Sequence, residues 1–264
     1  MGSGMYRESI ALFHRLIGWV VIYMSVEMGL QVAELQGVSP WILIVGWSVN
    51  WIFLLYLAFR NLLANRLEPS ANALDRLFGF ALRIVALIFP VMAVALFASL
   101  LFAVLLGASP DDNVPAEILD AQNDLDYGVL VVTAQIMWVL LFSLFGTGLP
   151  AYLERNRQGF VATFRQGSQA FWQTAGLLIV GPTVFDLLGE GIGMLAMFLS
   201  FGEYVSSDAV LPVVSEDWVP NIPIILLVLL RDVCYAFSII LTAWVLSKAY
   251  TNAVGNQHMV SVFE

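Results

Sequence analysis

The chain alternates between long apolar stretches and shorter segments that hold nearly all of its charged residues. A bilayer core about 30 Å thick is crossed by roughly 20 apolar residues in a helix. Six stretches meet this length, and no soluble domain separates them. The pattern therefore predicts one all-α membrane domain over residues 1–264. Its six transmembrane helices are expected at about 16–33, 41–59, 84–107, 127–153, 172–201 and 222–247.

Composition agrees with a membrane class and limits the kinds of partner. Hydrophobic residues make up 60% of the chain and charged residues 12%, whereas a soluble domain has roughly 25% charged residues. The net charge of −9 argues against nucleic acid, which recruits basic surfaces. A single cysteine, Cys234, excludes an internal disulfide. We expect contact with the lipid bilayer, and with other membrane proteins or a second copy of the chain.

The basic residues are segregated to one set of connections. Of the 11 Lys and Arg residues, all but Arg231 lie before span one, between spans two and three, between four and five, or after six. The opposite loops, 108–126 and 202–220, are acidic and contain no Lys or Arg. We interpret them as a solvated face, or alternatively as a surface for a basic partner or cations. The positive-inside rule predicts that both termini are cytoplasmic, in a bacterial inner membrane.

Three predicted cytoplasmic stretches mix apolar and basic residues at helical spacing: Glu8–Arg15, Asn72–Arg83 and Gly159–Phe171. Such segments are typical of amphipathic helices in the membrane interface, so we expect one before each of spans one, three and five. Leu87–Pro90 and Ile179–Pro182 occupy similar places, which suggests repeated helical hairpins; chance similarity between apolar sequences is the alternative. The glycines of span five predict a bend or a break.

One of these stretches carries a family resemblance. The run Phe164–Trp172, followed by Gly176-Leu177-Leu178, resembles the interfacial-helix signature of a broad group of bacterial membrane proteins. That group includes the membrane domain attached to some glycerophosphodiester phosphodiesterases. The resemblance covers residues 155–190, and elsewhere only the hydropathy is similar. No phosphodiesterase domain is present, so the resemblance implies an architecture and no catalytic residue.

Motifs of soluble enzymes are absent from the sequence. It contains no H-E-x-x-H, no P-loop, no dinucleotide-binding glycine pattern and no nucleophile elbow. The two histidines, His14 and His258, lie far apart and outside the spans, which argues against an axial haem ligand. Most tryptophans are expected to anchor helix ends or pack against lipid. We therefore expect no enzymatic activity, no metal and no cofactor.

Ionisable residues inside the spans are the candidates for function. At about 1.5 Å of rise per residue they all lie near mid-membrane, where a charge costs at least about 2.5–3.5 kcal/mol and normally faces protein or water. Polar side chains that could accompany them are Ser25, Asn50, Gln135 and Tyr235. The ionisable residues are Glu27, Asp186, Glu190, Arg231 and Asp232.

Two functions follow from this charge set. Four acids and one base cannot all pair, and we expect Arg231 to pair with Asp186 or Glu190 and fix spans five and six together. In that interpretation the chain is a non-enzymatic accessory, scaffold or assembly subunit of a membrane complex. The alternative is a small transporter or channel that moves protons, cations or a small solute past the carboxylates.

Overall fold

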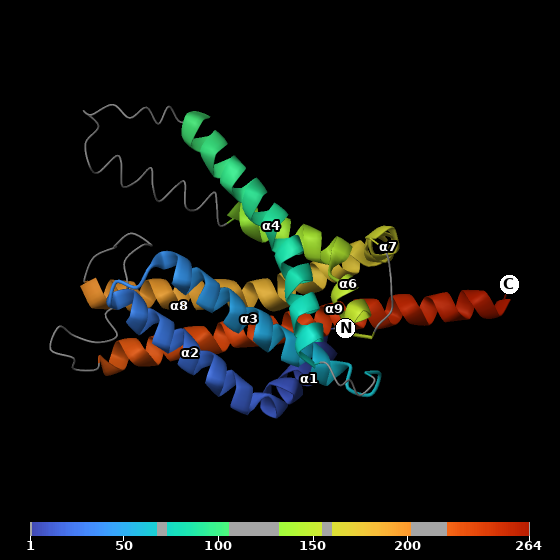
Figure 1. Cartoon of the computed structure of the whole chain (residues 1–264), viewed down its shortest axis with the longest axis horizontal. Helices are drawn as coiled ribbons and strands as arrows, with labels where there is room; N and C mark the ends of the chain where they lie inside the picture. The colour runs from blue at the N-terminus through green and yellow to red at the C-terminus, as the bar shows by residue number, and fades with distance from the viewer. Residues whose placement is uncertain (1, 68–72, 106–131, 155–159, 202–220, 264) are drawn as a thin grey trace.

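The computed structural model describes residues 2–67, 73–105, 132–154, 160–201 and 221–263, and these residues are all-helical (Figure 1). The acidic loops 108–126 and 202–220 lie outside them. In chain order the elements are α1 (Gly2–Arg15), α2 (Ile17–Leu35), α3 (Pro40–Leu62), α4 (Ala73–Leu105), a helix at Val132–Phe145, α6 (Gly148–Leu153), α7 (Phe160–Leu178), the π-helical segment η1 (Ile179–Thr183), α8 (Val184–Phe201) and α9 (Ile222–Phe263).

Four helical stretches of the described chain are long and apolar enough to cross a membrane. They are Pro40–Leu62, Leu74–Ala98, Val161–Ala196 and Ile222–Val254. A fifth is added if α1 and α2, which are bent by 77° at their junction, count as one span. The predicted multi-span helical class is confirmed.

Spans one, two and six begin within one residue of the predicted positions, at the starts of α2, α3 and α9. Span three differs, because α4 is one helix from Ala73 to Leu105. The sequence predicted an interfacial segment up to Arg83 and a span from Ile84. No helix-breaking residue stands at that boundary, so the amphipathic turns continue directly into the apolar ones.

The prediction of span four was wrong at its carboxyl end, because the stretch 127–153 is not one helix. A helix covers Val132–Phe145, the chain turns at Gly146–Thr147, and α6 follows. Pro150 lacks the N–H that would bond to the Gly146 carbonyl, since proline removes one donor from a helix ladder. Leu149 N–H donates to this carbonyl instead, at 3.1 Å, which tightens the turn.

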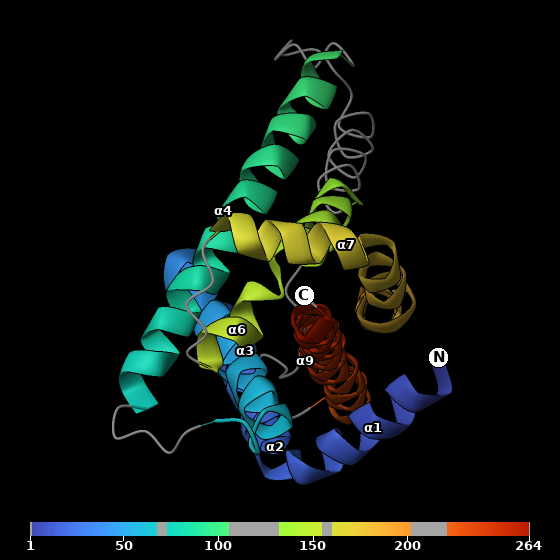
Figure 2. The same ribbon diagram turned by 90° about the vertical axis from the view of Figure 1, so that its right-hand side faces the viewer.

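Span five is continuous with the stretch before it, since α7, η1 and α8 follow one another without a gap. The predicted break is therefore absent, and the irregular part of this stretch is the π-helical segment, which contains Gly181 and Pro182. Gly167 of α7 lies against the Leu144 backbone of the preceding helix so closely that a Cβ atom there would overlap it. In Figure 2 the first turns of α7 run across the view, whereas α9 points along the line of sight.

Helix α9 is the centre of the bundle. It contacts α1, α2, α3, α6, α7, η1 and α8 (Figure 2). Every side chain from Ser238 to Ser247 is buried. A helix that is apolar all round is stable only when it is enclosed on all sides. The other helices are therefore organised around α9.

Helix α1 packs on this centre through one face, formed by Met5, Ser9 and Leu12 at helical spacing, and Leu16, directly after the helix, is buried as well. Two long-range hydrogen bonds fix it. The Trp244 indole Nε1 donates to the Glu8 carboxylate at 2.8 Å, so this tryptophan is a buried bridge and not a helix-end anchor. The Tyr6 hydroxyl donates to the Val180 carbonyl of η1, also at 2.8 Å.

Residues next to several helix ends meet on one side of the bundle. Glu154, after α6, lies 3.7 Å from the Arg66 guanidinium, after α3. The other Glu154 carboxylate oxygen accepts a hydrogen bond from the Tyr250 hydroxyl of α9 at 3.0 Å. The Arg83 guanidinium stacks 3.8 Å above the Tyr152 ring. These contacts join segments that the sequence assigned to the same side of the membrane.

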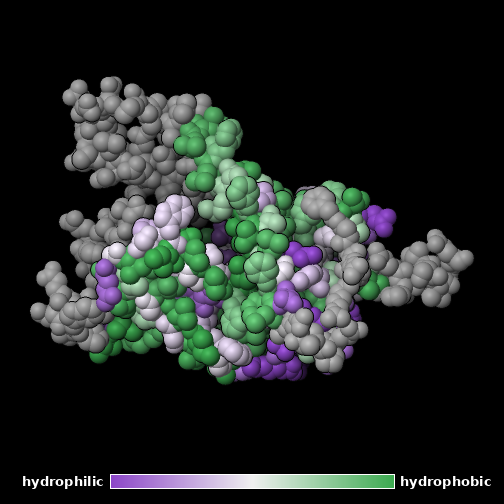
Figure 3. Space-filling model, viewed as in Figure 1, coloured by the Kyte–Doolittle hydropathy of each residue, from purple (hydrophilic) through white to green (hydrophobic). Residues whose placement is uncertain are grey.

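The outer surface is largely apolar. Large side chains on several helices point away from the bundle, among them Trp41 at 77% exposed and Trp172 at 85%. Figure 3 shows apolar residues spread over α2, α3 and α4. Such a surface suits contact with lipid, as the sequence predicted for the bilayer.

Candidate functional site

The contact between α8 and α9 depends on two glycines one turn apart. A Cβ atom on Gly189 would lie 2.7 Å from Tyr235 Cε1, and one on Gly193 would lie 3.5 Å from Arg231 Cδ. Glycines at this spacing let two helix backbones approach closely. The α9 side chains therefore lie directly against the α8 backbone, next to the acids of α8.

Arg231 pairs with its neighbour Asp232, and not with Asp186 or Glu190 as the sequence predicted. The Arg231 Nε and Nη2 atoms lie 3.2 and 3.1 Å from Asp232 Oδ1. The Asp232 side chain is 1% exposed, and its Oδ2 has no hydrogen-bond partner in the described part of the chain. Successive helical residues point in different directions, so sequence spacing gave no sign of this pair; the long arginine side chain folds back to reach it.

The two acids of α8 bond instead to hydroxyl groups of α9. Glu190 accepts a hydrogen bond from the Tyr235 hydroxyl at 2.9 Å, and Asp186 accepts one from Ser238. Neither acid forms an ion pair with Arg or Lys among the described residues. These bonds tie α8 to α9 without neutralising either carboxylate.

Glu27 of α2 is held from α3. The Asn50 amide nitrogen donates to the Glu27 carboxylate at 2.7 Å and to the Tyr23 carbonyl at 3.0 Å. Glu27 likewise has no Arg or Lys ion pair in the described chain. A third carboxylate without an ion pair to Arg or Lys among the described residues therefore lies on the α2 side, after Asp186 and Glu190 of α8.

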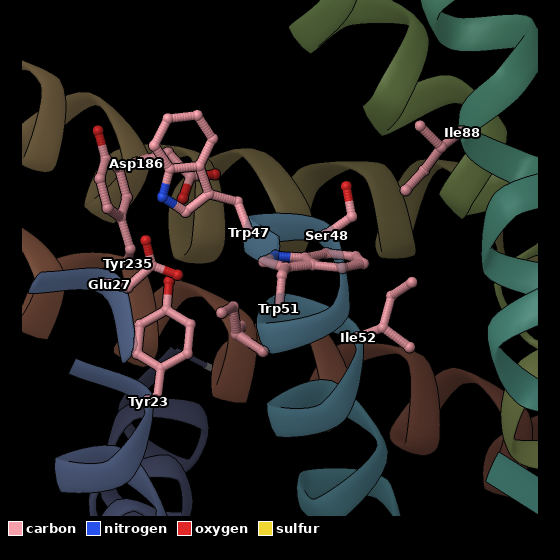
Figure 4. Close-up of a pocket in the computed structure, with 10 residues that line it drawn as sticks. Tyr23, Glu27, Trp47, Ser48, Trp51, Ile52, Ile88, Asp186 and Tyr235 are labelled. Carbon is pink, nitrogen blue, oxygen red and sulfur yellow. The ribbon is translucent and has the colours of Figure 1, made fainter. Parts of the chain in front are cut away.

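A cavity of about 340 Å³ lies between α2, α3, α8 and α9, with α4 at one end. Its polar end holds the Glu27 and Asp186 carboxylates and the Tyr23 and Tyr235 rings (Figure 4). The Tyr23 hydroxyl points toward the Glu27 carboxylate in this view. The cavity therefore presents two carboxylates from different helices to one space.

The remainder of the lining is mostly apolar and aromatic. Trp47 and Trp51, one turn apart on α3, project into the cavity, and Ile52 and Ile88 lie toward the α4 end (Figure 4). Ser48 is exposed, so the lining reaches the protein surface. The cavity thus has an acidic end and an apolar end.

The structure brings the predicted ionisable residues into one region but gives them different places. Glu27 and Asp186 line the cavity, whereas Glu190, Arg231 and Asp232 are not among its lining residues. They lie near it, since Tyr235 bonds to Glu190 and stacks with Arg231 at 5.9 Å.

The four polar residues that the sequence suggested as companions of the acids also differ in their places. Asn50 and Tyr235 bond to acids, and of the two only Tyr235 is among the residues that line the cavity. Ser25 bonds to the Val21 carbonyl on an exposed face, and Gln135 is not among the residues that line the cavity.

Sequence reasoning missed the tryptophans of the lining, because it treated tryptophans as lipid anchors. The available signal was spacing: Trp47 and Trp51 share one helix face, and Asn50 lies between them in the sequence.

Metal binding finds no support here. Among the described residues, no group of three or more His, Cys, Asp and Glu side chains is arranged to hold a metal ion.

Comparisons of the chain with protein-family models, with characterised proteins and with solved structures give no match, so a function for the chain has to be inferred from the geometry of the cavity.

Proposed function

We propose that this chain is a small membrane transporter that carries a proton or a small cationic solute through the intramembrane cavity. The observation that supports the proposal best is the pair of carboxylates, Glu27 and Asp186, that line one cavity without a basic partner in the described chain. In a medium of low dielectric constant such groups take up a proton or attract a cation. The proposal needs no catalytic step.

The experiment is flux into liposomes that contain the purified chain. Proton and monovalent-cation gradients are imposed, and internal pH and ion content are followed with trapped dyes. We expect flux that falls by at least about tenfold in Glu27→Gln and in Asp186→Asn, since each removes a charge at mid-membrane. The control is Asp75→Asn, because Asp75 is exposed on the first turn of α4. Flux that is absent, or equal in all four proteins, contradicts the proposal.

The proposal includes an orientation. Six spans with both termini in the cytoplasm are supported by the segregation of basic residues, and by the meeting of Arg66, Glu154 and Tyr250 on one side of the bundle. The helix at Val132–Phe145 is then the described part of the fourth span. A bacterial inner membrane is the compartment that the sequence favours. The resemblance of residues 155–190 to the interfacial-helix group stays a prediction about architecture.

A second candidate is the accessory or assembly subunit. It is favoured by α4, whose outer part diverges from α2, α3, α8 and α9 (Figure 1) and bears Phe89 at 73% exposed and Phe97 at 68%. Purification from native membranes followed by mass spectrometry tests it. Stoichiometric larger partners, together with no flux in liposomes, would favour this candidate over transport.

A further inference from the structure

We infer that the cavity binds an amphipathic organic ammonium ion, with its charged nitrogen between Glu27 and Asp186 and its apolar part along Trp47 and Trp51. This rests on the proposed function in using the same cavity, and it names the chemical class of the solute. Four features of the cavity lead to it: charge, aromatic lining, shape and volume.

The charge of the polar end selects a cation. Glu27 and Asp186 come from different helices and have no Arg or Lys ion pair within the described residues. The basic residue that lies close by, Arg231, is already bonded to Asp232 through two nitrogens. A ligand that brings a positive charge would balance carboxylates that the protein leaves unbalanced.

The lining favours an organic cation over a metal ion. A hard cation needs six or more oxygen ligands for Ca²⁺, or near-octahedral geometry for Mg²⁺. Here one Glu27 oxygen is already bonded to Asn50, and Asp186 to Ser238. Tryptophan faces, by contrast, attract ammonium groups by about 0.5–2 kcal/mol each, and aromatic cages for such ligands are built in this way.

The shape and volume of the cavity favour an amphipathic ligand. The apolar end, with Ile52 and Ile88, lies away from the carboxylates (Figure 4). A volume of about 340 Å³ is at the lower end of the range of about 300–1,000 Å³ for small-molecule pockets. An ammonium group with an attached ring or short alkyl chain fits both ends, and either a free amine or the headgroup region of an aminolipid has this chemistry.

The test is binding of 2-phenylethylamine to the purified full-length chain in non-ionic detergent, followed by tryptophan fluorescence and by calorimetry. Its neutral counterpart, 2-phenylethanol, is the ligand control. We expect saturable binding of the amine, at least about tenfold weaker binding of the alcohol, and similar losses for the amine in Glu27→Gln and Asp186→Asn. Equal binding of amine and alcohol, or no saturable binding, overturns the inference.

Matched variants separate the site from general damage. Glu34→Gln removes another acid of α2 that does not line the cavity, and should bind as the wild type does. Trp172→Phe removes an indole that is 85% exposed, and should leave the affinity unchanged. Ser48→Phe adds bulk at the exposed lining position without touching a buried polar group. It should weaken binding even if the acid variants fail to fold, and unchanged affinity in a folded Ser48→Phe protein would count against the site.

Two further arms identify the source of the ammonium group and separate this inference from transport. In nanodiscs, phosphatidylethanolamine should compete with 2-phenylethylamine if a lipid headgroup is the occupant, whereas phosphatidylglycerol should not. If 2-phenylethylamine binds with the same affinity in phosphatidylethanolamine and phosphatidylglycerol nanodiscs, the natural ligand is a free amine and not a lipid headgroup. Binding of the amine without flux of protons, alkali ions or the amine itself supports the inference and removes the transport proposal. Flux of protons or alkali ions without amine binding does the reverse.

Discussion

Asn50 and Glu27 form a 2.7 Å hydrogen bond between α3 and α2, and the same amide nitrogen lies 3.0 Å from the Tyr23 carbonyl. One side chain of α3 therefore contacts two points that are one turn apart on α2. This contact holds the Glu27 carboxylate at the edge of the cavity. Its removal gives the first prediction.

Asn50→Leu should destabilise the protein by about 1–3 kcal/mol, because Glu27 then loses its donor inside the bundle. Adding Glu27→Leu should restore part of the loss, since no acceptor is left unbonded. Thermal unfolding in detergent measures both. Asn61→Leu, near the end of α3, is the control and should have a smaller effect. A double variant as unstable as the sum of the two single ones would mean that the bond contributes nothing.

Gly189→Ala should separate α8 from α9, because the new methyl group would meet the Tyr235 ring. Overpacking of this kind costs about 1–3 kcal/mol. Gly191→Ala is a matched control two residues away, since a Cβ atom there has no neighbour within 4 Å. We expect a lower unfolding temperature and lower amine affinity for the first variant only. Equal behaviour of the two variants would rule out the close approach at Gly189.

The Arg231–Asp232 pair predicts a specific pattern of coupling. Each single leucine variant leaves one charge without its partner, so each should destabilise more than the Arg231→Leu/Asp232→Leu double variant. Combining Arg231→Leu with Asp186→Leu should give additive losses. The coupling energy between two polar residues in a membrane bundle averages only about 0.6 kcal/mol. The sign of the measured coupling energy, more than its size, therefore decides the test. If Asp186→Leu instead recovers stability lost in Arg231→Leu, the ion pair between Arg231 and Asp186 that the sequence predicted would be correct.

The orientation is tested with single cysteines in a Cys234→Ala background. Cysteines at Asp120 and Ser206 should react with an impermeant thiol reagent in intact cells, because both loops are predicted to be external. Cysteines at Asn65 and Gln158 should react only after lysis. Reaction at Asn65 in intact cells would reverse the topology.

Much of the helix layout could be predicted from hydropathy, because the bilayer thickness fixes how long an apolar helix must be. The starts of α2, α3 and α9 follow from this length alone. The break before α6 could not be predicted in the same way, since Leu149 and Ala151 keep the segment apolar while Pro150 lacks the N–H that would bond to the Gly146 carbonyl.

The two acids of the candidate site could be predicted from the sequence, but its aromatic lining and the pairing of the charged residues could not. A charge at mid-membrane is costly wherever it points, so Glu27 and Asp186 stood out from their positions inside apolar stretches. Which groups meet depends on the rotation of each helix about its axis, which hydropathy does not contain. For that reason Arg231 was assigned to the wrong acid, and Trp47 and Trp51 were treated as lipid anchors.

The π-helical segment Ile179–Thr183 has a consequence for how this chain tolerates changes of length. A π-helical turn accommodates one more residue than an α-helical turn over the same stretch. Deletion of Ile179 should therefore convert the segment to α-helix and leave Asp186 facing Ser238. Deletion of one residue in regular helix, such as Leu187, would turn every later side chain by about 100° and move Glu190 away from Tyr235. This segment is thus the place within α7–α8 where the chain can lose a residue without rearranging the acids of α8.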